Sequence, residues 1–299
     1  MPIKASIQSA LASLQSLLPD SSQISRNQRR LSIRLSITGL DAMRLLHTLT
    51  YDVKVFFNNV PLYAILSHTW GDEEVTFQDI TVAHKRSSLE GWSKVVNACH
   101  RAAVDGWEYI WIDTCCIDKT DTTELGEAIN SMFSWYRDAQ ICYAYLADVP
   151  PRYFVPSSES GVEPSFVPWR WYFRSSRWFT RGWTLQELLA PGFLLFLDQQ
   201  WGNIGAREEW ADEIYRATGI GVKHLLDFQQ CCIAVKLSWA ANRHTTREED
   251  RAYSLLGLLG INMPLIYGEG RRAFIRLQYE LISRYNDESI FAWGNIKSK

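Results

Sequence analysis

The chain has 299 residues, of which 46% are hydrophobic and 21% are charged, proportions typical of a soluble globular protein with a well-buried core. A formal net charge of −2 argues against a nucleic-acid-binding surface, and no apolar run reaches the length of a membrane span. The six cysteines contain no C-x-x-C pair, so they predict neither a metal site nor a disulfide framework and favour the cytoplasm. The thirteen tryptophans are unusual, and such rings either pack in a core or stack on a ring-bearing ligand.

Residues 1–42 differ from the rest of the chain in composition. They are rich in Ser and Gln and poor in acidic residues, and apolar side chains recur at helical spacing between Ile7 and Leu18. A basic, Ser-rich start is also typical of a mitochondrial presequence. We interpret the segment as an N-terminal extension, expected to be mobile.

The next part of the chain, residues 43–200, alternates short apolar runs with amphipathic segments. The runs predict strands at 63–67, 109–113, 140–146 and 193–198. The segments between them predict helices at 92–105, 124–138 and 181–190, and a long loop rich in Pro, Ser and aromatic residues at 150–176. This alternation predicts an α/β fold with an open parallel sheet flanked by helices, whose ligands bind at the carboxyl ends of the strands.

Residues 201–299 show no alternation of strands and helices and predict a mainly helical C-terminal region. The helical patterns cover 207–217, 230–241, 247–260 and 270–285. The tripeptide Gly268-Glu269-Gly270 lacks the third glycine of a nucleotide fingerprint and follows no predicted strand, so we do not interpret it as one.

Polar clusters follow the predicted strands, at the edge of the sheet where a ligand would bind. Ser67, His68 and Trp70 follow the first strand, and Asp113 and Asp118 flank the end of the second. His68 is a candidate base or a candidate hydrogen-bond donor to a phosphate group. The alternative is a partly buried histidine whose hydrogen bonds are satisfied within the protein. The two aspartates are candidates either to bind a ligand or to cap the following loop.

Two cysteines, Cys115 and Cys116, lie between these aspartates. One of them is a candidate nucleophile with His68 as its base, because both segments follow strands and are expected to meet at one edge of the sheet. The alternative is that both are small buried hydrophobic residues.

Trp183 and Glu187 stand four positions apart in the helix predicted at 181–190, so the indole and the carboxylate share one face. A flat ring beside a carboxylate suits a ligand that is part aromatic base and part ribose. The W-x-x-x-E spacing alone is unspecific, and a buried tryptophan beside a glutamate paired with arginine is the alternative.

Three segments of this chain resemble, in order and spacing, the blocks of the fungal heterokaryon-incompatibility (HET) domain family. They read YAILSHTWGDEEVTF, YIWIDTCCIDKTDTTELGEAINSMFSWYRDAQICYAYLADV and SSRWFTRGWTLQELLAP. The stretch HTTREEDRAYSLLGLLGINMPLIYGEGRRAFIRLQ is similar to the sequence that follows this core in many members. The resemblance covers most of residues 43–293 and implies a function in fungal non-self recognition, in which HET domains trigger cell death when incompatible strains fuse.

The HET family is itself similar to TIR domains, which implies a flavodoxin-like fold. The run ELGEAI, QICYAYLADV and SSRWFTRGWTLQEL resembles the plant TIR order of helix, strand and Ser-x-Trp-Cys-Leu-x-Glu-Leu helix. Glu187 falls where NAD-cleaving TIR enzymes carry their catalytic glutamate, and Trp183 falls on the accompanying tryptophan. Thr184 replaces the usual cysteine.

This resemblance implies an NAD nucleosidase that cleaves the N-glycosidic bond of NAD or a related nucleotide, which is a substrate and not a cofactor. Nicotinamide in NAD⁺ is already a cationic leaving group, so the reaction needs a carboxylate, Glu187, to stabilise the oxocarbenium-like ribose. Trp183 would stack on a base and Arg181 would hold the pyrophosphate. The opposite wall of this site is assigned to Ser67, His68 and Trp70.

TIR domains also include non-enzymatic modules that oligomerise and recruit partners, so the fold alone does not choose between the two functions. In either case the resemblance implies a homo-oligomer in the active state. It also implies possible partners among sensor proteins with nucleotide-binding and repeat domains.

Overall fold

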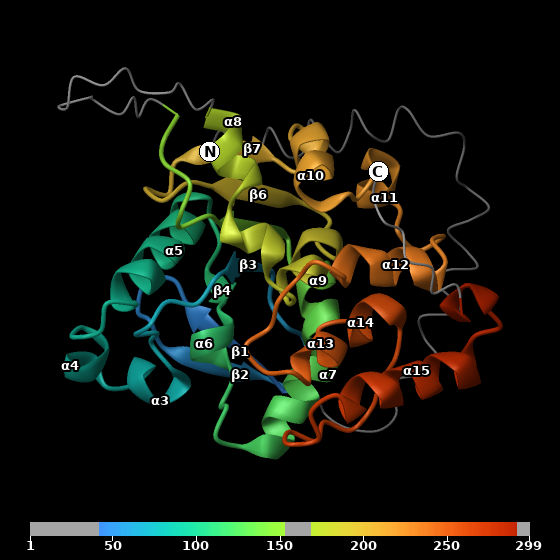
Figure 1. The fold of residues 1–299 in the computed structure, drawn as a ribbon. Helices are drawn as coiled ribbons and strands as arrows, with labels where there is room; N and C mark the ends of the chain where they lie inside the picture. The colour runs from blue at the N-terminus through green and yellow to red at the C-terminus, as the bar shows by residue number, and fades with distance from the viewer. Residues whose placement is uncertain (1–41, 153–168, 292–299) are drawn as a thin grey trace.

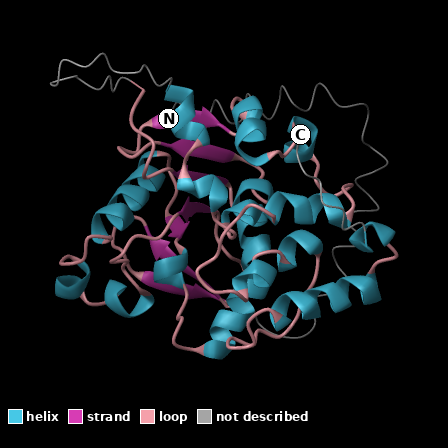
Figure 2. Ribbon diagram, in the orientation of Figure 1, coloured by secondary structure: helices cyan, strands magenta, loops and turns pink. Residues whose placement is uncertain are grey.

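The computed structural model describes residues 42–152 and 169–291, and these ranges form a mixed sheet with helices packed on both faces (Figures 1 and 2). The predicted N-terminal extension lies almost wholly outside the described residues, as does most of the loop predicted at 150–176. No helix in the described ranges is both long and apolar enough to cross a bilayer.

Seven strands form the sheet in the order β2-β1-β4-β3-β5-β6-β7. They are β1 (Met43–His47), β2 (Val53–Phe56), β3 (Tyr63–His68), β4 (Tyr109–Trp111), β5 (Ile141–Tyr145), β6 (Leu194–Leu197) and β7 (Asn203–Ala206). The four central strands pair in parallel, whereas β1, β2 and β7 pair antiparallel at the two edges. All six residues of β3 are buried, as expected of a strand covered on both faces.

Helices connect the central strands and cover the sheet. The connecting elements are α3 (Phe77–Ile80), α4 (Ala83–Arg86), α5 (Trp92–Val104), α6 (Asp113–Cys116), α7 (Thr122–Asp138), α8 (Trp169–Arg174), the 3₁₀ turn η1 (Arg177–Thr180) and α9 (Thr184–Leu189). In Figure 1, α5 lies on the opposite side of the sheet from α7 and α9. The connection from β3 to β4 runs in one direction across the sheet, and the connection from β4 to β5 runs back in the other. Because both crossovers are right-handed, their helices lie on opposite faces of the sheet.

The C-terminal helical region packs on α7 and α9, on the right-hand side of Figure 1. Its elements are α10 (Ala211–Thr218), α11 (Val222–Leu226), α12 (Ile233–Ala240), α13 (Asp250–Tyr253), α14 (Leu256–Leu259), α15 (Arg272–Arg284) and the 3₁₀ turn η2 (Glu288–Phe291). The predicted helical character of this region is confirmed.

Local sequence explains the boundaries of the helix that carries much of the site, α7. The Asp121 carboxylate caps its start by accepting hydrogen bonds from the backbone N–H groups of Thr123 at 2.9 Å and Glu124 at 3.2 Å. Its buried side chains, from Ala128 to Tyr136, recur at helical spacing and face the sheet.

Three details differ from the sequence-based expectation. The sheet is mixed instead of wholly parallel, because the β1–β2 hairpin and β7 add antiparallel edges. Strand β7 lies beyond residue 200 and escaped prediction because Asn203 and Gly205 are weak strand formers beside a single apolar residue, Ile204. The short helix α8 falls within the loop predicted at 150–176.

The contact between α14 and α7 gives a test of this packing. A methyl group at Gly257 would overlap Cβ of Phe133, which ring rotation does not move, so Gly257→Ala must shift α14 relative to α7. We expect the free energy of unfolding to fall by about 1–3 kcal/mol. The control is Gly126→Ala within α7, where a methyl group meets nothing within 4 Å and helix propensity predicts a gain of about 0.5–1 kcal/mol. Urea unfolding measures both, and equal stability of the two variants would contradict the packing.

Candidate functional site

A pocket of about 370 Å³ opens at the carboxyl ends of the central strands, between the sheet and the C-terminal helical region. Strands β3 and β5 are neighbours whose connections leave in opposite directions, and ligands in open α/β sheets bind beside such a pair. The polar and aromatic residues that line it are His68, Trp70, Asp113, Lys119, Tyr136, Arg181, Trp183, Thr184, Glu187, Thr246, Arg247, Asp250 and Tyr267. We call it the Glu187 pocket.

Glu187 projects from α9 into this pocket and is only 7% exposed. The Ser67 hydroxyl, at the end of β3, donates a hydrogen bond to Oε2 of Glu187. Ser67 in turn accepts a hydrogen bond of 2.8 Å from Nε1 of Trp178. Because an indole N–H only donates, it leaves the hydroxyl proton of Ser67 free for the carboxylate. The two buried side chains therefore fix the position of Glu187.

Burial raises the pKa of Glu187 to about 8, and the neighbouring Asp113 acts in the same direction. The hydrogen bond from Ser67 and the charges of Arg181 and Arg243 oppose the shift without cancelling it. At neutral pH the pocket thus holds Glu187 mainly in its protonated form. A cationic ligand beside it would favour the carboxylate.

His68 and Asp113 form the wall on the β3 and β4 side. His68 lies 3.8 Å from Oδ1 of Asp113 and 3.9 Å from Oε2 of Glu74, and its burial lowers its pKa to about 4. The imidazole is therefore neutral at physiological pH and is not a general acid there. Burial works against ionisation of Asp113, but Lys119 and the hydrogen bond from Trp70 hold the pKa of Asp113 below its usual value.

Trp70 and Lys119 stand at the mouth of the pocket. Nε1 of Trp70 donates to Oδ2 of Asp113 at 2.9 Å, and Nζ of Lys119 lies 3.6 Å from the centroid of the Trp70 ring. Since Trp70 is 47% exposed, this cation–π pair presents a flat, positively charged rim to an incoming ligand.

The C-terminal helical region supplies the remaining wall. The backbone N–H of Gly182 donates to the carbonyl of His244 at 2.8 Å, and the N–H of His244 donates to the carbonyl of Thr180 at 2.7 Å. This pairing holds the segment that begins α9 beside the segment that leads to α13. It brings Asp250 into the pocket, where Tyr267 donates to its Oδ1 at 2.9 Å.

Six of the eight residues predicted from the sequence as site residues line the pocket together: Arg181, Trp183, Glu187, His68, Trp70 and Asp113. Ser67 lies behind Glu187, fully buried, and positions the carboxylate instead of facing the pocket.

Asp118 is the exception, because the structure places it away from the pocket wall. Its Oδ1 accepts hydrogen bonds from the Thr120 hydroxyl at 2.6 Å, from the backbone N–H of Thr120 at 2.9 Å and from Nε2 of Gln78 at 2.6 Å, and these bonds lower its pKa. The single turn of α6 separates it from the end of β4, and it caps the following loop, which was the alternative interpretation.

The structure also decides whether Cys115 or Cys116 is a nucleophile, and it shows what the loop at Gly268–Gly270 binds. Cys115 and Cys116 are buried in the core, and burial raises the pKa of both thiols, to about 12 for Cys116, so neither is an activated nucleophile.

The backbone N–H groups of Gly268 and Gly270 donate to Oε1 of Glu249 at 2.8 and 3.0 Å. That loop binds a carboxylate of its own chain.

Sequence reasoning missed the pocket residues that come from distant segments. Lys119 directly follows Asp118 in the sequence, but no spacing indicated that its side chain would lie over the ring of Trp70. Arg247, Asp250 and Tyr267 lie in the stretch that only the family resemblance had singled out. Within the described ranges, no group of three or more His, Cys, Asp or Glu side chains is placed to hold a metal ion.

The fold and the pocket define an α/β domain with a pocket at its strand ends, and the C-terminal helical region forms the second wall of that pocket. Residues 63–165 match the family described as heterokaryon incompatibility protein (HET), and residues 272–299 match a domain of unknown function, DUF8212. The chain belongs to the HET family.

The chain is 44% identical over 227 residues to vegetative incompatibility protein HET-E-1 of Podospora anserina. The aligned stretch is 74% of this chain and 16% of that protein, so the chain spans only about a sixth of the relative. No solved structure matches the chain significantly. The HET match includes His68 and Asp113, whereas Glu187 lies beyond it.

The raised pKa of Glu187 predicts how stability depends on pH. The folded state favours the protonated carboxyl, so its contribution is fully present below the unfolded pKa near 4.5 and is lost as pH rises to about 8. We therefore expect wild-type protein to lose stability relative to Glu187→Gln over this range, with a limiting slope of about 1.4 kcal/mol per pH unit. Chemical unfolding of both proteins from pH 5 to 9 measures the difference. A difference that stays constant with pH would contradict the shift.

Proposed function

We propose that this protein acts in vegetative (heterokaryon) incompatibility and triggers cell death by cleaving the N-glycosidic bond of NAD or a related nucleotide. Membership of the HET family and the similarity to a vegetative incompatibility protein support the cellular role. The observation that carries the chemistry is the buried carboxyl of Glu187, which lines the pocket together with Trp183 and Arg181.

The pocket suits one half of a dinucleotide. Its volume of about 370 Å³ falls within the range of small-molecule sites, and its walls combine rings with a few polar groups. Trp183 offers a face for a nicotinamide ring, and Arg181 and Lys119 supply positive charge for phosphates. Glu187 lies among these groups, at the place where a ribose would join ring and phosphate.

In the proposed reaction the bond between C1′ of the ribose and the ring nitrogen breaks. The electron pair of that bond passes to the nicotinamide ring, which leaves uncharged, and the Glu187 carboxylate stabilises the positive charge that develops on the ribose. Water then adds to C1′ and releases its proton, giving ADP-ribose. The neutral His68 is not a general acid at physiological pH, and the reaction requires no proton from it.

Ionisation of Glu187 links this mechanism to pH. In the empty pocket the pKa of Glu187 is about 8, whereas the cationic ring of NAD⁺ favours the carboxylate once it is bound. We expect kcat/KM to rise with pH and to level off near pH 8, because that ratio reports the free protein. In contrast, kcat reports the bound state and should level off at lower pH. A pH profile of nicotinamide release measures both, and a kcat/KM that is flat or falls from pH 6 to 8 would rule out Glu187 as the ionising group.

The central test is consumption of NAD⁺ by the full chain, purified and concentrated, beside Glu187→Gln. We expect turnover to fall by about 10²-fold or more in the variant, because glutamine keeps the shape of the side chain but has no charge. The matched control is Glu280→Gln on α15, whose carboxylate is exposed and pairs with Arg284. Equal turnover in Glu187→Gln and wild type would disprove the assignment.

Trp183 gives an independent test of ligand stacking. We expect Trp183→Ala to raise KM by about tenfold, since stacking of a base on an aromatic side chain contributes about 1–3 kcal/mol. Trp171→Ala in α8 is the control, because Trp171 is 49% exposed and does not line the pocket. Steady-state kinetics separates the two variants, and an unchanged KM in Trp183→Ala would remove Trp183 from the binding site.

A non-enzymatic signalling module is the second candidate function. Three apolar side chains on the outer face of α15 favour it: Ile275, Tyr279 and Ile282 are 48%, 69% and 46% exposed, and they recur at helical spacing. As such a module, the protein would act as a homo-oligomer in the cytoplasm. Its candidate partners are sensor proteins with nucleotide-binding or repeat domains. Cell death caused by Glu187→Gln at wild-type abundance would favour the module over the enzyme.

A further inference from the structure

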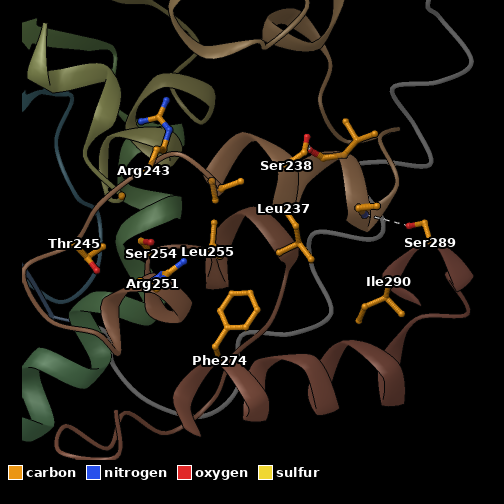
Figure 3. Close-up of a pocket in the computed structure, with 15 residues that line it drawn as sticks. Leu237, Ser238, Arg243, Thr245, Arg251, Ser254, Leu255, Phe274, Ser289 and Ile290 are labelled. Carbon is orange, nitrogen blue, oxygen red and sulfur yellow. Dashed lines mark hydrogen bonds between the residues drawn. The ribbon is translucent and has the colours of Figure 1, made fainter. Parts of the chain in front are cut away.

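A second and larger cavity, of about 640 Å³, lies inside the C-terminal helical region (Figure 3). It is enclosed by α12, by the α13–α14 pair and by α15 with η2. Its lining is mainly apolar, and its most informative members are Leu237, Ser238, Arg251, Leu255, Phe274 and Ile290. Figure 3 shows Leu237 and Phe274 projecting toward each other from opposite walls, α12 and α15.

The charged side chains of this cavity have one sign. Two arginines, Arg243 and Arg251, line it, and none of the described carboxylates does. Arg251 lies on α13, and within the described part of the chain its guanidinium has neither an ion pair nor a hydrogen bond. Two other exposed arginines of this region are paired, Arg271 with Glu248 at 2.9 Å and Arg284 with Glu280 at 3.3 Å, whereas Arg272, which does not line the cavity, also has no ion pair or side-chain hydrogen bond among the described residues.

Arg243 adds positive charge inside the wall. Its Nη1 donates to the carbonyl of Arg181 and to Oγ1 of Thr184, each at 2.9 Å, whereas its Nη2 is buried without a partner among the described residues. The nearest acid that acts on its charge is Glu187, whose raised pKa leaves it mostly uncharged at neutral pH. The cavity wall therefore carries positive charge that the described residues do not balance.

We propose that this cavity binds an amphipathic anion, a small molecule with an apolar body and a single carboxylate or similar acidic group. The apolar body packs between α12 and α15, against Leu237 and Phe274, and the acidic group pairs with Arg251. Sites of this volume hold drug-sized ligands, and a mainly apolar lining with few polar groups is their usual composition.

This cavity shares a wall with the Glu187 pocket. Gly182 and Thr245 line the cavity, whereas Arg181, Trp183 and Thr246 line the pocket on the other side. The two segments pair as a parallel bridge between Arg181 and His244, so successive residues face opposite sides, as in a strand. A ligand in the cavity consequently touches the backbone that positions the pocket residues. Its binding does not depend on NAD cleavage, so the two proposals succeed or fail separately.

The test uses decanoate as the probe and titration calorimetry on the full chain. We expect saturable binding of one decanoate, weakened about fivefold in Arg251→Gln, as for a partly exposed ion pair. Leu237→Trp should abolish binding, because the larger ring occupies the cavity. Arg271→Gln and Leu226→Trp are matched controls outside the cavity and should bind as wild type does. Uncharged 1-decanol and cationic decyltrimethylammonium should bind more weakly than decanoate.

Several results would overturn the proposal. Equal affinity for the three ten-carbon probes would show that charge does not select the ligand. Unchanged decanoate binding in Leu237→Trp would place the ligand elsewhere, and no saturable binding to wild type would exclude the site. Thermal melting of every variant identifies any that fails to fold, and Ser238→Trp on the same helix then replaces Leu237→Trp as the blocking variant.

Discussion

The buried carboxyl group of Glu187 is the constraint on which the rest of this structure depends. Removing an ionised carboxylate from water costs several kcal/mol unless hydrogen bonds and charges compensate it. The chain compensates in three ways: Ser67 donates a hydrogen bond, the arginines at 181 and 243 lie within electrostatic reach, and the raised pKa keeps the group protonated while the pocket is empty. Each of these requires a different part of the fold to be in place.

The C-terminal helical region belongs to the site for the same reason. Arg243 enters from that region and donates to Thr184 in α9, one turn from Glu187. The pairing of Gly182 with His244 leaves no room for a side chain at 182, where a methyl group would overlap Thr245. This glycine is therefore needed for close approach of two backbones. A chain that ended after the sheet would lose this pairing, the wall it forms and part of the charge beside Glu187.

Sequence patterns predicted the regular core and failed where long-range contacts decide. The strands at 63–67 and 140–146 and the helix at 124–138 were predictable because continuous apolar runs and helical stripes report burial locally. Strand β7 was not predictable from local sequence, because its pairing with β6 supplies the stability that its own residues lack. At the site, the shared face of Trp183 and Glu187 followed from helix geometry. The covering of that face by Asp250 and Tyr267 did not, because no local pattern encodes the pairing at His244. The abundance of tryptophan was likewise visible in the sequence. The sequence did not indicate that Trp178 would donate a hydrogen bond to Ser67 behind the Glu187 carboxyl, or that Trp70 would line the mouth of the pocket.

The electrostatics of the empty pocket also distinguish among ligands. Asp113 stays ionised beside Lys119, whereas Glu187, which lines the same pocket from α9, holds its proton because it is buried. A neutral ligand would leave this arrangement unchanged. A cationic ring beside these carboxyl groups would stabilise the ionised form of Glu187, and because binding then releases the proton of Glu187, the affinity for such a ligand would rise as pH approaches the pKa of about 8. The site is thus better matched to a ligand that carries positive charge next to its ribose and negative charge farther along, toward Arg181 and Lys119, than to an uncharged nucleoside. In the proposed reaction the ring becomes neutral on cleavage, so the carboxylate would lose its partner and the pKa of Glu187 would return toward about 8, which would favour reprotonation and release of the product.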